Sequence, residues 1–139
     1  MRTTTKGPQV LVRELLGGEV DTCPPHLSMV AAARRMIDED IGSLAVVDAG
    51  ELVGIVTERD VLRAVADEKL SRRSKVAEVM TPRPDSLEPD VDVQEASEWM
   101  MAAGYRHLPV TDSGELIGMI SIKDLMWALT EAAAGRTGV

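Results

Sequence analysis

Aromatic residues are scarce in this 139-residue sequence, which has no phenylalanine, one tyrosine and two tryptophans. Hydrophobic residues nevertheless make up 45% of the chain, and eight residues are methionines. The core must therefore be built from aliphatic side chains and Met. A single cysteine, Cys23, excludes an internal disulfide and a zinc site with several cysteines, which fits a reducing compartment.

Long apolar runs are missing as well, since no segment approaches the ~18 residues of a membrane span. The first residues, MRTTTKGP, lack the apolar stretch of a secretory signal. The net charge of −8 argues against electrostatic binding to nucleic acid or to an anionic membrane. We therefore expect a soluble cytoplasmic protein that binds neither.

The residue patterns of catalytic and metal sites are also absent. The two histidines, His26 and His107, and the one cysteine show no metal-ligand spacing. The sequence has no paired carboxylates, no nucleophile elbow and no phosphate-loop lysine. We therefore expect no enzyme, no metal site and no required cofactor.

The sequence contains an internal repeat. An offset of 64 residues places Val12–Ala66 over Val76–Thr130 without a gap, and the best-matched stretches are LAVVDAGELVGIVTERDVL and LPVTDSGELIGMISIKDLM. A unit of ~55 residues buries too little surface to be stable alone. Two copies therefore predict one compact domain with a pseudo-twofold axis and paired clefts where the copies meet.

Each copy predicts the order β-α-β-β-α, so the expected fold class is α/β, an α+β sandwich of two small sheets with helices outside. The expected division is a tail over 1–9, repeat 1 over 10–66, a linker over 67–74, repeat 2 over 75–133 and a tail over 134–139. The expected elements of the first copy are helices over Val10–Leu16 and Met29–Asp38, strands over Leu44–Val47 and Leu52–Val56, and a helix after Thr57. Those of the second are helices over Lys75–Met80 and Val93–Ala103, strands over Leu108–Thr111 and Leu116–Ile120, and a helix after Ser121. Ser28 and Asp92 are the expected N-caps of the two central helices.

Both copies end in Gly-apolar-apolar-[Ser/Thr]-x-x-Asp, over 54–60 and 118–124, and the segment VAEVMTP precedes the second copy. With these motifs in register, the chain resembles a tandem pair of CBS domains, a unit also called a Bateman module. The resemblance covers nearly all of Val12–Thr130. It implies two repeats packed around pseudo-twofold clefts, a homodimer, and binding of an adenine nucleotide in the clefts.

The hydroxyl-x-x-Asp motif has two interpretations. It is a capping box that satisfies the free N–H groups of a helix start. Alternatively, the helix start is an anion site, and the Asp can accept hydrogen bonds from both ribose hydroxyls. The resemblance implies phosphate contacts for Thr57 and Ser121, and ribose contacts for Asp60 and Asp124.

Arg106 and His107 precede a predicted strand. They are either solvated residues at the end of a loop or a phosphate clamp, and the resemblance favours the clamp. The first copy has Gly42 and Ser43 at these positions, so two occupied clefts would bind differently. The candidates for contact with the base are Thr22, Leu44, Ala45, Val46, Ser86, Leu108, Pro109 and Val110.

These observations favour a regulatory module that senses an adenosine-containing nucleotide and signals to a separate, unknown partner protein. AMP, ADP, ATP, a cyclic dinucleotide, NAD(H) and S-adenosylmethionine all remain open as ligands. The alternative is a ligand-free, dimeric protein-interaction scaffold. The homodimer is expected because two apolar helix stripes exceed what one thin layer buries. They are Ala96/Met100/Ala103 and Leu125/Met126/Leu129.

Overall fold

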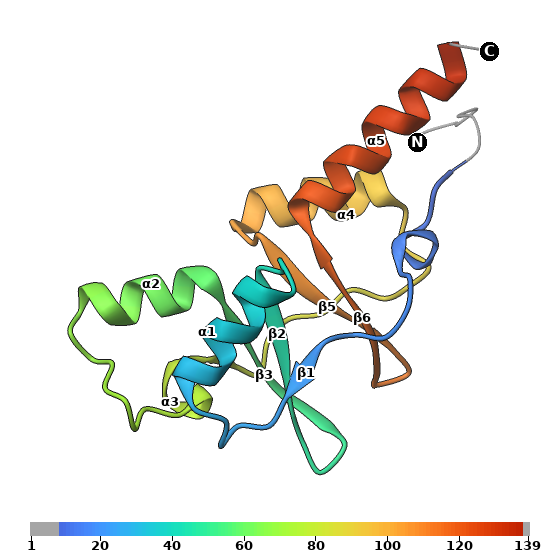
Figure 1. Cartoon of the computed structure of the whole chain (residues 1–139). Helices are drawn as coiled ribbons and strands as arrows, with labels where there is room; N and C mark the ends of the chain where they lie inside the picture. Colours follow the sequence, from blue (N-terminus) through green and yellow to red (C-terminus); the bar gives the residue numbers. More distant parts are fainter. Residues whose placement is uncertain (1–8, 138–139) are drawn as a thin grey trace.

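The computed structural model describes residues 9–137 and contains two α+β lobes that follow the two repeats (Figure 1). Repeat 1 contains β1 (Thr22–Cys23), α1 (Met29–Asp38), β2 (Ser43–Asp48), β3 (Glu51–Thr57) and α2 (Glu58–Ala66). Repeat 2 contains α4 (Val93–Ala103), β5 (His107–Asp112), β6 (Glu115–Ser121) and α5 (Ile122–Thr137). The short elements η1 (Val12–Leu15), α3 (Val76–Val79) and β4 (Thr81–Pro82) lie ahead of β1 and between the repeats.

The two hairpins confirm the expected strands, each extended slightly at its ends. β2 and β3 pair antiparallel in a four-stranded sheet of order β1-β2-β3-β4, and β5 and β6 form a two-stranded sheet. Their turns use Ala49-Gly50 and Ser113-Gly114, all four with positive φ. Two consecutive residues with positive φ match the twist of a tight hairpin, so the local sequence determines both turns.

The first strand of repeat 2 is reduced to a single bridge. In repeat 1, β1 pairs in parallel with β2, and the Ala45 N–H donates to the Asp21 carbonyl over 3.1 Å. In repeat 2 the only pair is Leu87 with Val110. Pro109 stands where repeat 1 has Ala45, and proline has no N–H to donate. The order β-α-β-β-α is therefore complete in the first copy but lacks a full first strand in the second.

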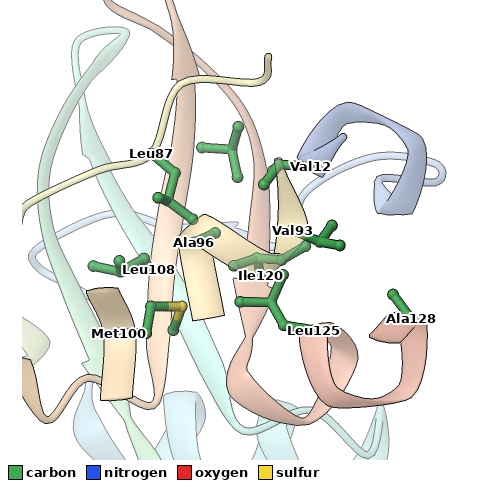
Figure 2. Close-up of a cluster of buried hydrophobic side chains, with 10 residues drawn as sticks. Val12, Leu87, Val93, Ala96, Met100, Leu108, Ile120, Leu125 and Ala128 are labelled. Atoms are coloured by element: carbon green, nitrogen blue, oxygen red, sulfur yellow. The ribbon is translucent and has the colours of Figure 1, made fainter. Parts of the chain in front are cut away.

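Each repeat contributes its leading segment (residues 10–20 or 74–84) to the core of the other repeat. Val12 of the first leading segment is fully buried in the core of repeat 2. Figure 2 shows the cluster around it, with Leu87, Val93, Ala96, Met100, Leu108, Ile120, Leu125 and Ala128 labelled. Val76 of the second leading segment is buried with Cys23, Met29, Ala32, Met36, Leu44, Val46 and Val56 of repeat 1.

Backbone hydrogen bonds hold the exchanged segments in place. The Val12 N–H donates to the Val91 carbonyl over 2.9 Å, and the Val76 N–H donates to the Leu27 carbonyl over 2.8 Å. These bonds are related by the repeat. Neither core is complete without a segment of the other copy, so the two repeats form one cooperative unit.

Two repeat-related glycines allow the leading segments to approach the sheets. A Cβ atom at Gly54 would overlap the Met80 side chain and lie 3.0 Å from the Thr81 carbonyl oxygen. A Cβ atom at Gly118 would overlap only the side chain of Leu16. The absence of a side chain at both positions is therefore a packing requirement.

Helices α1 and α4 have the expected bounds. Ser28 caps α1, since its side chain accepts a hydrogen bond from Ala31 N. Asp92 does not cap α4 with its side chain, which corrects the sequence expectation; its backbone pairs with Leu11 of the first leading segment. The expected tail over 134–139 is partly helical, because α5 continues to Thr137. Of the other expected tail, residues 1–8 lie outside the described part of the chain.

No helix within residues 9–137 combines the length and the apolar composition that a membrane crossing requires.

The glycine pair makes the exchanged packing testable. We expect Gly54→Ala to lower the free energy of unfolding by about 1–3 kcal/mol through overpacking, because the new methyl meets a backbone carbonyl as well as Met80. Gly118→Ala should lower the free energy of unfolding by less, because only the flexible end of the Leu16 side chain must move. Chemical denaturation measures both losses, and Leu16→Ala should restore most of the smaller one. Equal losses for the two glycine variants, with no recovery when Leu16→Ala is added to Gly118→Ala, would contradict this packing.

Candidate functional site

A cleft of about 1870 Å³ lies between the repeats and is lined by both of them. The two hydroxyl-x-x-Asp motifs open into it together. It therefore contains two half-sites related by the repeat, the repeat-1 half-site at Thr57 and Asp60 and the repeat-2 half-site at Ser121 and Asp124.

Both motifs form reciprocal capping boxes, as the first interpretation predicts. Thr57 N–H donates to Asp60 Oδ2 over 2.9 Å, and Asp60 N–H donates to Thr57 Oγ1 over 3.2 Å. The corresponding distances in repeat 2 are 3.1 Å and 3.0 Å. In each box the second carboxylate oxygen, Oδ1, takes no part in the cap. At both helix starts this oxygen therefore lies outside the cap and can accept another hydrogen bond.

The two carboxylates differ in exposure. Arg63 lies 3.8 Å from Asp60 Oδ1, and the Asp60 side chain is only 11% exposed. Repeat 2 has Trp127 at the position of Arg63, and Asp124 is exposed. The carboxylate of the repeat-2 half-site is therefore the more open of the two.

His107 reaches across the pseudo-twofold axis into repeat 1. Its Nε2 atom lies 3.0 Å from the place where a Cβ on Gly42 would stand, and the Oε1 atom of Glu58 lies 3.3 Å from the same place. Both side chains thus converge over Gly42. Sequence alone could not assign His107 to one cleft; in the fold it lies at the junction of the half-sites.

Burial lowers the pKa of His107, and the positive charge of Arg106 adds to this effect. The carboxylates of Glu58, Asp124 and Asp60 act in the opposite direction but do not outweigh the burial. Because the pKa falls below its usual value of 6.5, the imidazole is largely neutral at pH 7. His107 then serves there as a hydrogen-bonding group rather than as a fixed positive charge.

The candidate base contacts are mostly not brought to the cleft. Of the eight residues, Leu108 alone lines it. The side chains of Leu44, Val46 and Val110 are fully buried in the two cores, because both faces of these strands are covered. The Ser86 hydroxyl lies 3.1 Å from that of Thr111. The others away from the cleft are Thr22, Ala45 and Pro109.

The leading segments line the cleft instead. Residues 15–21 reach the repeat-2 half-site, because Leu16 packs on Gly118. Thr81 and residues 83–85 reach the repeat-1 half-site, because β4 pairs with β3. These contributions could not be predicted from the sequence, since no local pattern signals that the segments are exchanged.

The comparisons with known proteins agree with this architecture. A family model described as the CBS domain matches residues 12–67 and 76–131. The chain belongs to the CBS domain family. Among curated relatives, the uncharacterised protein YlbB of Bacillus subtilis is 36% identical over 130 residues, which cover 91% of this chain and 86% of YlbB.

Solved CBS structures confirm the expected fold. ATU1752 from Agrobacterium tumefaciens has a TM-score of 0.81 at 34% identity, with 86% of this chain and 99% of that chain covered. The CBS pair of MJ0100, in complex with 5′-methylthioadenosine and S-adenosyl-L-methionine, has a TM-score of 0.82 at 27% identity, with coverages of 90% and 99%. PAE2072 from Pyrobaculum aerophilum, complexed with AMP, has a TM-score of 0.76 at 25% identity, with coverages of 88% and 99%.

One relative is an enzyme, but only part of it is similar. Inosine-5′-monophosphate dehydrogenase of Korarchaeum cryptofilum is 36% identical over 85% of this chain, which covers 24% of the enzyme. This partial likeness transfers no catalytic activity to the CBS pair. Within residues 9–137, no cluster of three or more His, Cys, Asp or Glu side chains is arranged for a metal ion.

The position of His107 between the CBS half-sites predicts its titration. We expect the proton NMR midpoint of its ring to lie below 6.5 in the free protein, since burial favours the neutral form. AMP should raise that midpoint, because a nearby phosphate favours the imidazolium. AMP affinity should accordingly increase as the pH falls through the pKa of His107.

The His107→Gln variant assigns the resonance and is the control for titration of the AMP phosphate itself. A midpoint at or above 6.5 in the free protein would contradict the effect of burial, and a midpoint that AMP leaves unchanged would place His107 outside the ligand's reach.

Proposed function

We propose that this CBS pair is a regulatory module that binds an adenosine-containing nucleotide, such as AMP, ADP or ATP, between its repeats. The observation that carries the proposal is the duplicated helix start. Two hydroxyl-x-x-Asp boxes open into one cleft, and each keeps a carboxylate oxygen outside the cap. If the two boxes served only as helix caps, they would not both need to face the same cavity.

The proposed roles follow from this geometry. Asp60 and Asp124 accept hydrogen bonds from ribose hydroxyls. Thr57 and Ser121 contact phosphate at the positive ends of their helices, and Arg106 and His107 complete the anion contacts. Apolar cleft residues pack against the base, and they include Leu16, Ile55, Leu108, Ile117 and Met119.

The solved relatives support an adenosine ligand. PAE2072 is complexed with AMP, and the MJ0100 pair with 5′-methylthioadenosine and S-adenosyl-L-methionine. These ligands share adenosine and differ in the group at the 5′ carbon. The two carboxylates suit the shared part, and the helix starts face the part that varies.

We further propose that the module is a homodimer in the cytoplasm. The stripe residues Ala96, Met100 and Leu125 are buried in the core and do not form the interface that the sequence suggested. Other helix faces carry exposed apolar side chains. Those on α4 and α5 are Trp99, Met101, Met126 and Trp127, and those on α1 and α2 are Val30, Ile37, Leu62 and Val65.

A second copy of the chain would cover these faces. Ligand would then act by favouring one arrangement of repeats or protomers, to the extent of its differential affinity for that arrangement. A separate partner protein would receive the signal. The alternative is a ligand-free scaffold, in which the boxes serve only as caps.

Removing one carboxylate oxygen separates binding from capping. We expect Asp124→Asn to weaken AMP binding by about tenfold or more, as loss of a hydrogen bond to a charged group implies. The free energy of unfolding of this variant should fall by only about 1 kcal/mol, which is the effect of a weakened helix cap. Calorimetry and thermal unfolding measure the two effects, and Asp60→Asn is the matched variant. Normal AMP affinity in both variants would refute the ribose assignment of Asp60 and Asp124.

The exposed helix face predicts the oligomeric state. Light scattering at tens of micromolar should give the mass of a dimer, and the double substitution Met101→Glu with Trp127→Glu should give a monomer, because it places charges within the proposed interface. Glu115→Lys, at the exposed end of the β5–β6 hairpin, is the control and should remain dimeric. A monomeric wild-type protein would refute the proposed dimer.

A further inference from the structure

The two half-sites have the same backbone geometry but different charges at the helix start. Glu58 is the first residue of α2, and its N–H donates to the Gly42 carbonyl over 3.0 Å. Ile122 is the first residue of α5, and its N–H donates to the Arg106 carbonyl over 2.8 Å. The repeat-1 half-site therefore has Glu58 and Gly42 at the positions where the repeat-2 half-site has Ile122 and Arg106.

The Glu58 carboxylate occupies the region that a phosphate would need in the repeat-1 half-site. Its Oε1 atom lies 3.3 Å from the position of a Cβ on Gly42, beside His107. It therefore stands at the start of α2, where the positive end of the helix dipole attracts an anion. The protein supplies that anion itself, and a ligand phosphate would meet a like charge.

Among the other charges near the helix starts, Arg63 has no charged counterpart in repeat 2, but it lies 3.8 Å from Asp60 Oδ1 and pairs with that carboxylate. Burial lowers the pKa of His107, so its ring does not neutralise Glu58 at pH 7. Arg59 and Lys123 correspond through the repeat, as do Asp60 and Asp124. Arg83 also lines the cleft, but its N–H donates to the Val53 carbonyl. Val53 lies four residues before Thr57 on β3, about 13 Å at the usual strand rise. The backbone of Arg83 is therefore distant from the start of α2, and its counterpart in the alignment of the two repeats is Glu19 of the other leading segment.

We propose that Glu58 makes the repeat-1 half-site selective for adenosine ligands without a 5′ phosphate, with an uncharged or cationic group there instead. The repeat-2 half-site, with Ile122 and Arg106, takes the phosphorylated ligand. This inference rests on the proposed function and specifies the ligand class of each half-site. The cleft then holds one phosphorylated and one unphosphorylated adenosine ligand.

The repeat provides reciprocal substitutions as a test. Calorimetry should give one AMP per chain for the wild-type protein and two adenosines per chain. Glu58→Ile, which copies repeat 2, should bind two AMP per chain. Ile122→Glu, which copies repeat 1, should lose at least about tenfold in AMP affinity, as a like charge beside the phosphate implies. Adenosine binding should change in neither variant.

A second variant covers the chance that Ile122→Glu does not fold, because Ile122 packs against the core of repeat 2. Glu58→Gln removes only the charge from an exposed side chain and should also raise the stoichiometry to two AMP per chain. Two AMP per chain in the wild-type protein, or one in both Glu58 variants, would overturn the inference while the adenosine sites stand. Absence of adenosine and AMP binding in the wild-type protein would refute the proposed function itself, and the inference with it.

Discussion

The burial of each leading segment in the core of the opposite repeat is the constraint on which the rest of the structure depends. Val12 completes the core of repeat 2, and Val76 completes that of repeat 1. Each repeat is too small to bury a sufficient core alone, and the exchange supplies the missing apolar surface. The same exchange brings residues of both repeats to the walls of one cleft. Stability of the pair and assembly of the site therefore have one physical origin.

The helix starts combine their structural role with the binding role that we propose, in the same few atoms. Thr57 and Asp60 satisfy each other's backbone N–H groups, as do Ser121 and Asp124. The caps fix the side-chain orientation of both carboxylates before any ligand arrives. Each carboxylate uses one oxygen for the cap and keeps the other for a ligand. Preorganisation of this kind reduces the entropy that binding would otherwise cost.

Local patterns were sufficient for much of the fold but not for the site. Helices α1 and α4 and both hairpins follow from apolar periodicity and turn residues, which act over a few positions. Even the shortened first strand of repeat 2 has a local cause in Pro109. Alternation of apolar residues cannot reveal that both faces of a strand such as β2 are covered, so the burial of the Leu44 and Val46 side chains in a core could not be predicted from it. The exchange of leading segments is long-range, and no local pattern announces it.

Hydrogen exchange with and without AMP tests most directly whether the cleft is the ligand site. The account predicts slower amide exchange in three segments that meet only in the folded cleft. These segments are residues 16–20, 104–107 and 117–124. Protection confined to the outer faces of α1 and α2, or no change at saturating AMP, would contradict it.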